Sequence, residues 1–177
     1  KKSFGPIKNS VTIYYLNVIL VLSLFITFIL MFQGGYNSFG KALLASVFQV
    51  ASFISTTGFG NADNALWPML ANIFLLLAAF HCGCSGSTTG GIKADRMLII
   101  FKEIGNEFKR RLHPSSVFCT KVDDHTVNNE QISAVFLYFV AYVFILFVSF
   151  MAVLLSGVEI SDAFSGTLAS LGNVGPG

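Results

Sequence analysis

Charged residues are scarce in this sequence. Aspartate, glutamate, lysine and arginine together make up 11% of its 177 residues, and apolar residues make up 54%. In an ordinary soluble domain about 25% of the residues are charged. So few charged side chains cannot cover the surface of a water-soluble globule of this length. The composition therefore excludes a free-standing soluble enzyme and a disordered chain, and it indicates a protein of the lipid bilayer.

Cysteine content and net charge are also low. The three cysteines, Cys82, Cys84 and Cys119, are an odd number, which excludes a scaffold built on disulfides. A formal net charge of only +2 does not suit a nucleic-acid binder. The sequence opens KKSFGPIKNS, without an initiator methionine or a signal peptide, and ends LGNVGPG directly after an apolar stretch. We therefore expect it to be part of a longer polypeptide.

Two uncharged stretches are long enough to cross a membrane. The first covers residues 11–32 and the second covers residues 132–158. A helix over the 22 residues of the first stretch rises about 33 Å, and the hydrocarbon core of a bilayer is about 30 Å thick. We therefore predict membrane-spanning helices over 11–32 and 131–156. Residues 42–57 and 161–170 are also apolar, but both stretches are too short to span comfortably.

The order of these segments indicates an internal repeat. A long span, a short apolar segment and an interrupted long segment at 65–92 are followed by a polar linker, another long span and another short segment. Each short segment runs 18 positions from an opening glycine to a glycine-rich turn, from Gly40 to Gly58 and from Gly157 to Gly175. The two glycine pairs are 117 positions apart. The pattern predicts two copies of one unit, the second incomplete.

The basic residues predict an orientation. Ten of the eleven lie before the first span or in the polar linker at 93–129, and only Lys41 lies on the other side. Because basic residues are enriched in cytoplasmic loops, we expect the N-terminus and the linker to be cytoplasmic. Both short segments would then enter the membrane from the outside and return there.

Each short segment ends in a glycine-containing turn. We call STTGFG at 55–60 the first glycine turn and NVGPG at 173–177 the second glycine turn. Backbone that is not helical at membrane depth is tolerated only against protein or a water-filled pore. Glycine permits the positive φ that can align carbonyl groups, and rows of carbonyls can replace the water shell of a cation. The residues predicted to line an ion path are Thr56, Thr57, Gly58, Phe59, Asn173, Val174 and Gly175.

The interrupted long segment contains the run CGCSGSTTGG at 82–91. A glycine costs about 1 kcal/mol in a helix, so four glycines with serine and threonine should unwind it near the bilayer middle. Polar backbone at that depth must face a cavity; the alternative is a flexible helix end at the cytoplasmic face. We call residues 83–91 the break loop. Its members are Gly83, Cys84, Ser85, Gly86, Ser87, Thr88, Thr89, Gly90 and Gly91.

Three motifs in this order resemble one protein family. They are STTGF, GCSGSTTGGIK and GNVGPG, and together they are similar to the Trk/Ktr/HKT superfamily of potassium transporters, above all to its bacterial TrkH branch. TTGFG resembles the TVGYG filter of potassium channels, and NVGPG is a more divergent match in the same frame. The resemblance implies an all-α membrane protein, with potassium-channel-like span–pore helix–filter–span repeats around a pseudo-fourfold pore.

The resemblance also implies boundaries. The third repeat would cover 1–105 and the partial fourth repeat 131–177, joined by a cytoplasmic linker at 106–130. In the third repeat the implied parts are a span at 11–32, a pore helix at 40–54, a filter at 55–60 and a broken second span at 65–105. In the fourth they are a span at 131–156, a pore helix at 160–171 and a filter at 172–177.

The implied function is potassium translocation across the bacterial inner membrane, as in a symporter, without catalysis. K⁺ would be the transported ion, bound at Thr56, Thr57, Asn173 and Val174, and no organic cofactor is expected. The break loop would be the gate beneath the filter. The implied partners are membrane lipid, a second copy of the subunit in a homodimer and a cytosolic nucleotide-binding regulatory subunit. No nucleic acid is expected.

Three other interpretations remain. One is a homotetrameric potassium channel, against which the two unequal filters in one chain argue, and another is a sodium-permeable relative. The third is a membrane enzyme or metal protein that uses His81, Cys82 and Cys84, although these potential ligands are crowded and have no partner pair nearby. GSTTGGIK also lacks the Gly-Lys-Ser/Thr order of a phosphate-binding loop.

Overall fold

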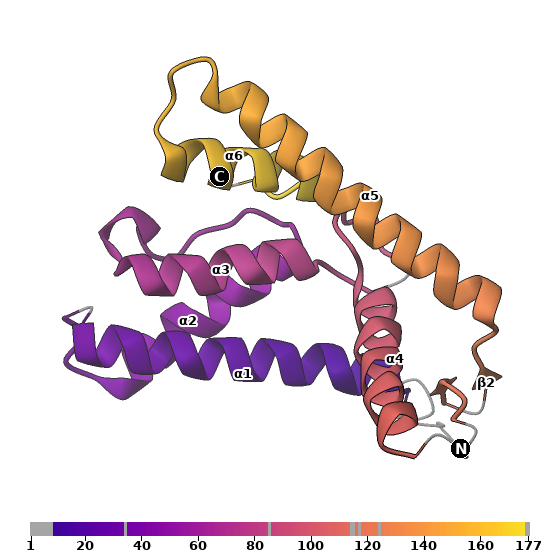
Figure 1. Ribbon diagram of the computed structural model, residues 1–177. Coiled ribbons are helices and arrows are strands. Elements are labelled where there is room, and N and C mark those ends of the chain that lie inside the picture. The colour runs from indigo at the N-terminus through magenta and orange to yellow at the C-terminus, as the bar shows by residue number, and fades with distance from the viewer. Residues whose placement is uncertain are drawn as a thin grey trace.

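The structure is a computed structural model that describes residues 9–33, 35–84, 86–113, 116, 118–123 and 125–175. In these residues the regular structure consists of six α-helices, a 3₁₀ turn and a two-stranded hairpin (Figure 1). The predicted Ser85, and the last two residues of the predicted second filter, lie outside the described residues. The elements are α1 (Ser10–Gln33), α2 (Phe39–Ile54), η2 (Asn64–Leu66), α3 (Met69–His81), α4 (Ala94–Leu112), β1 (Lys121–Val122), β2 (His125–Thr126), α5 (Asn129–Leu154) and α6 (Ile160–Gly172).

Helices α1 and α5 are the two long apolar helices of the described chain. They have 24 and 26 residues, which correspond to about 36 Å and 39 Å of helix and exceed the thickness of a hydrocarbon core. Many large apolar side chains of α5 are exposed, among them Leu137 and Phe144. A helix that is apolar on all sides suits lipid or other membrane helices rather than water.

Helices α2 and α6 are the short counterparts of α1 and α5. They have 16 and 13 residues, or about 24 Å and 20 Å of helix. Both begin at the end of the molecule opposite the hairpin and stop partway along the long helices (Figure 1). Neither reaches the hairpin end, so the chain after each of them leaves the helix at an intermediate depth.

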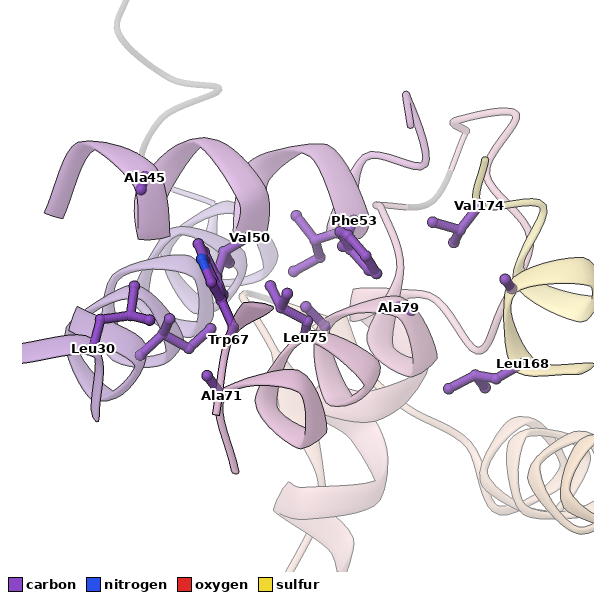
Figure 2. Packing of buried hydrophobic residues seen from close by; sticks show 14 of the residues in the cluster. Leu30, Ala45, Val50, Phe53, Trp67, Ala71, Leu75, Ala79, Leu168 and Val174 are labelled. Atoms are coloured by element: carbon purple, nitrogen blue, oxygen red, sulfur yellow. The ribbon is translucent and has the colours of Figure 1, made fainter. Parts of the chain in front are cut away.

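The main apolar core lies where α1, α2 and α3 pack together. Val50 and Phe53 of α2 lie against Leu75 of α3 and the side chain of Trp67, and Leu168 of α6 extends the same cluster (Figure 2). Small buried residues such as Ala42, Ala45 and Ser46 in α2 and Ala71 and Ala78 in α3 let the helix backbones approach closely. This core holds α2 at a fixed depth beside α3.

Helix α4 begins where the broken second helix resumes and runs across the hairpin end of the molecule (Figure 1). It ends at Leu112, so it continues past the boundary predicted at residue 105. Its polar side chains bind the segment that follows: Lys102 Nζ donates to the carbonyl oxygen of Lys121 at 2.8 Å, and Asn106 Nδ2 donates to Thr120 Oγ1 at 2.8 Å. The part of the predicted linker that follows α4 therefore packs partly against this helix.

The hairpin also contacts the first turn of α1. The carboxylate of Asp123 accepts hydrogen bonds from the backbone amide of Ser10 at 2.8 Å and from its hydroxyl at 2.6 Å. The first amides of a helix have no partner within the helix, and a carboxylate at that end is also favoured by the helix dipole. Asp123 therefore caps α1 from a distance of 113 positions along the chain.

We expect the Asp123→Ala variant to fray the first turn of α1 at pH 7. The hydrogen bonds from Ser10 lower the pKa of Asp123 below its ordinary value, so the cap is complete above about pH 4 and is lost as the pH falls through that lowered pKa. Hydrogen exchange of the first turn in the full-length protein, normalised to intrinsic rates, should be faster in the variant at pH 7.

The difference between the two proteins should shrink as the pH falls through the lowered pKa of Asp123, because protonation then removes the cap from the wild type. Thr126→Ala is the matched control, because this exposed hairpin residue contributes only its backbone to the strand pair. Equal exchange in the wild type and the Asp123→Ala variant at pH 7 would contradict the capping role.

Candidate functional site

The structure brings the two glycine turns together. A Cβ atom added to Gly175 would lie 3.1 Å from the Cα of Gly58, so the two backbones are in direct contact. Three residues at these turns have left-handed backbone: Thr56 and Asn173 each have a φ of +58°, and Gly58 has a φ of +77°. Such conformations cost a non-glycine residue energy and occur mostly where surrounding structure fixes them.

At the glycine turns the amides nearest the helix ends are bonded, whereas the carbonyl oxygens accept no hydrogen bond from the described residues. The amide of Thr57 donates back to the carbonyl of Ser52 at 3.1 Å, and the amide of Val174 donates back to the carbonyl of Ala169 at 2.8 Å. These bonds satisfy carbonyls at the ends of α2 and α6. Among the described residues, no hydrogen bond reaches the carbonyl oxygens of Thr56, Thr57, Gly58, Asn173 and Val174. These oxygens are free to accept from water or to contact a cation.

The helices that precede the turns add a favourable potential for a cation. Both α2 and α6 end at the point where the turns meet. The C-terminal end of a helix carries about half a negative charge. Two such ends at one place, with free carbonyl oxygens beside them, favour a cation over an anion.

The helix break is a closed loop in the structure. Helix α3 ends at His81, and Cys82 follows with a φ of +54°. The amide of Ala94, at the start of α4, donates to the carbonyl of Gly83 at 3.0 Å and closes the neck of the break loop. Inside the loop the hydroxyls of Ser87 and Thr89 are 2.6 Å apart, and the tip at Gly86 is exposed.

Three helices hold the break. The amide of Gly90 donates to the carbonyl of Gly172 in α6 at 3.2 Å. The hydroxyl of Tyr138 in α5 donates to the carbonyl of Gly91 at 3.1 Å. The ring of His81 shares a hydrogen bond of 2.8 Å with the hydroxyl of Tyr14 in α1. The break loop therefore lies directly beside the residue that precedes the second glycine turn.

Comparison with known proteins agrees with this arrangement of half-length helices, glycine turns and a broken helix. A family model described as TrkH, a cation transport protein, matches residues 7–177. The chain belongs to the TrkH family.

Individual TrkH proteins match most of the chain. It is 37% identical over 163 residues to the Trk system potassium uptake protein TrkH of Salmonella typhimurium, covering 92% of this chain and 34% of that protein. It is 39% identical over 136 residues to TrkH of Halomonas elongata, covering 77% of this chain and 28% of that protein. The crystal structure of the potassium transporter TrkH from Vibrio parahaemolyticus superposes with a TM-score of 0.88 at 31% identity, covering 96% of this chain and 36% of that one.

These findings confirm the family resemblance and the all-α membrane fold class. They also show that the chain spans about a third of the length of the relatives that it matches. The described chain also contains a hairpin of two-residue strands. Long apolar runs do not predict such a hairpin.

The predicted TrkH filter residues differ in their surroundings. The side chain of Phe59 is 71% exposed, whereas that of Val174 is 6% exposed and packs into the apolar cluster with Leu168 (Figure 2). The hydroxyl of Thr57 lies 3.4 Å from the carbonyl oxygen of Ser52. These residues share a backbone that lies in one of the two glycine turns, although their side chains differ. This is consistent with carbonyl groups, and not side chains, as the ligands.

Gln49 joins α2 to the segment that follows the first glycine turn and was not predicted. It lies in α2 with only 1% of its surface exposed. Its Nε2 donates to the carbonyl of Ala62 at 2.8 Å and to Oδ1 of Asn64 at 2.7 Å. A Cβ at Gly60 would lie 3.6 Å from the same nitrogen. The sequence signal for Gln49 is that it is a single amide side chain within the apolar run VFQVASF, because a buried polar side chain needs a hydrogen-bond partner.

The residues of the alternative metal interpretation make contacts within the protein. His81 is bonded to Tyr14, and the thiol of Cys82 lies 2.6 Å from the carbonyl oxygen of Ala79. Cys84 is half-buried at the start of the break loop. Within the described residues no group of three histidine, cysteine, aspartate or glutamate side chains is placed to hold a metal ion. His81 and Cys82 thus contribute to the packing around the break.

Proposed function

We propose that this chain is the third repeat and part of the fourth repeat of a subunit that moves K⁺ across the bacterial inner membrane. The observation that carries the proposal is the contact between Gly58 and Gly175 at the ends of two half-length helices. This contact between two turns whose carbonyl oxygens accept no hydrogen bond from the described residues supports an ion path between them. The relatives of this chain are named as potassium uptake proteins.

The ion would be bound by backbone oxygens. A dehydrated cation needs several oxygen ligands to replace its water shell, and carbonyl groups on a fixed backbone supply them without a net charge. In this proposal the carbonyls of Thr56, Thr57, Asn173 and Val174 bind K⁺ on one side of the pore. Other parts of a longer TrkH protein would supply the remaining ligands around a pseudo-fourfold axis.

The break loop would be the gate. It lies beside Gly172, at the base of the second turn, and its tip is exposed. The small side chains of the loop let it change shape with little loss of packing. Its internal hydrogen bonds between Ser87 and Thr89 hold one closed shape in this structure. We propose that this shape obstructs the path below the turns and that movement of the loop opens it.

The hairpin end of the molecule would face the cytoplasm. Lys93, α4 and the hairpin carry most of the basic residues of the described chain, and they gather at the end where α1 begins (Figure 1). In this orientation α2 and α6 enter from the outside, as basic residues at the cytoplasmic face require. The exposed apolar sides of α1 and α5 would meet lipid, further repeats or a second subunit in a homodimer, and the hairpin end would meet a cytosolic nucleotide-binding regulator.

Ion flux of the full-length protein tests the proposed function. Liposomes that are loaded with K⁺ and contain the protein should take up tracer Rb⁺. They should take up Na⁺ much more slowly, because carbonyl sites of fixed geometry discriminate between K⁺ or Rb⁺ and the smaller Na⁺. Empty liposomes are the control. Absence of Rb⁺ uptake by folded protein would overturn the proposal, and equal Na⁺ and Rb⁺ fluxes would identify a sodium-permeable relative instead.

A further inference from the structure

Among the described residues, one backbone hydrogen bond joins the break loop to the end of α6, directly before the second glycine turn. The amide of Gly90 donates to the carbonyl oxygen of Gly172 with an N–O distance of 3.2 Å. Gly172 is the last residue of α6 and directly precedes Asn173, where the second turn begins. The two glycines are 82 positions apart in the sequence, so their contact depends on the packing of α6 beside the break.

The backbone of Gly90 lies too close to α6 to carry a side chain. A Cβ atom at Gly90 would lie 2.7 Å from the carbonyl carbon and oxygen of Gly172 and 2.8 Å from the carbonyl oxygen of Leu171. The φ of Gly90 is outside the left-handed region. Glycine is therefore required here by the close approach alone, because the opposing atoms are backbone and cannot rotate away.

Gly172 is enclosed on its other side as well. A Cβ atom there would lie 3.3 Å from the carbonyl oxygen of Ala79 in α3 and 3.6 Å from the thiol of Cys82. The end of α6 is thus wedged between α3 and the break loop. Displacement of Gly90 would remove one side of this enclosure and the amide donor to the Gly172 carbonyl, which would leave this oxygen only the Cys82 thiol at 3.9 Å among the described residues.

A chain of contacts connects Gly172 to the first glycine turn. Only Asn173 and Val174 separate Gly172 from Gly175, which lies against Gly58 of the first turn. The side chain of Val174 is buried, so this short link is packed rather than free. Between the break loop and the first turn, by contrast, the described residues form no hydrogen bond. The loop thus supports one of the two turns and reaches the other only through it.

We propose that Gly90 is a positioning residue for ion selection. Resting on the proposed function, the Gly90–Gly172 contact holds the second glycine turn in its selective geometry, and it persists when the exposed tip of the break loop at Gly86 moves. Loss of the contact loosens the second glycine turn against Gly58. The ion preference of the pore then depends on a residue that binds no ion.

The test uses the full-length protein in planar bilayers, with K⁺ on one side and Na⁺ on the other. The reversal potential gives the permeability ratio of the two ions. Gly90→Ala should lower the K⁺ preference by about three- to tenfold, since the loss of one hydrogen bond changes an equilibrium by about that factor. Gly105→Ala is the matched control, because this helical glycine in α4 has no atom within 4 Å of an added Cβ.

Gly172→Ala is the second variant and displaces the end of α6 from its other side, since the added Cβ would lie 3.3 Å from the carbonyl oxygen of Ala79 and from Cγ2 of Val174. If Gly90→Ala does not fold, this variant tests whether a shift of the Gly172 carbonyl changes the permeability ratio. A folded variant with a wild-type permeability ratio would overturn the positioning role and leave the proposed function intact. Absence of any K⁺ current in the wild-type protein would instead overturn the proposed function. A shifted ratio in Gly105→Ala as well would show that the effect is not specific to the contact.

Discussion

Gly58→Ser is expected to lose most of the discrimination between K⁺ and Na⁺ in the full-length protein. Gly58 has a φ of +77°, and a residue with a side chain pays about 1–2 kcal/mol for left-handed backbone. The backbone of Gly175 lies against Gly58, so the strain cannot be relieved by a shift toward the second turn. A change of about 1.4 kcal/mol in the difference between the binding free energies of K⁺ and Na⁺ changes their permeability ratio about tenfold.

The reversal potential under mixed K⁺ and Na⁺ measures this loss. Gly35→Ser is the matched control, because Gly35 has a similar φ of +69° but no atom within 4 Å of an added Cβ. The Gly35→Ser variant introduces a similar backbone strain at a site outside the two glycine turns. If folded Gly58→Ser protein keeps the wild-type ratio and conductance, Gly58 lies outside the ion path.

The long and short helices could be predicted because their signals are local. The uncharged run that forms α1 and the one that forms α5 each exceed the thickness of a bilayer core, and the short runs that form α2 and α6 each lead into a glycine-containing turn. The position of the break follows from the clustering of glycine at 82–91, because glycine destabilises any helix regardless of its neighbours. Resemblance to the TrkH branch supplied the roles of these segments.

The contacts that support the site could not be predicted, because they join residues far apart in the sequence. Asp123 caps α1 at Ser10, and Gly90 donates to Gly172, yet nothing local to these residues marks the partner. Gly90 is one of four glycines in the break, and sequence alone treats all four as helix breakers. The structure separates them: Gly86 has a φ of +89° in open space, whereas Gly90 is needed for a close approach. Helix α4 also depends on packing, since its charged face binds the hairpin.

Gly86 lies at the exposed tip of the break loop and Gly90 at its contact with α6, so the proposed gate can be tested without disturbing the second glycine turn. Deletion of residues 86–88 removes the exposed tip of the break loop but keeps Gly83, Gly90 and Gly91, which contact the neck and α6. If the loop is the proposed gate, a shorter loop would obstruct less of the path, and it also loses the internal bond between Ser87 and Thr89. We therefore expect a higher open probability in single-channel recordings of the full-length protein, by about tenfold for each 1.4 kcal/mol lost from the closed state.

The K⁺ to Na⁺ ratio of the deletion variant should stay near that of the wild type, because the Gly90–Gly172 contact remains. This outcome differs from the one expected for Gly90→Ala, in which the ratio changes. Thr88→Ala is the matched control, since it alters the exposed tip but keeps the length of the loop. Folding is checked by size-exclusion chromatography and thermal unfolding before recording. A folded deletion variant with the open probability of the wild type would show that the loop fills space beside α6 without controlling the pore.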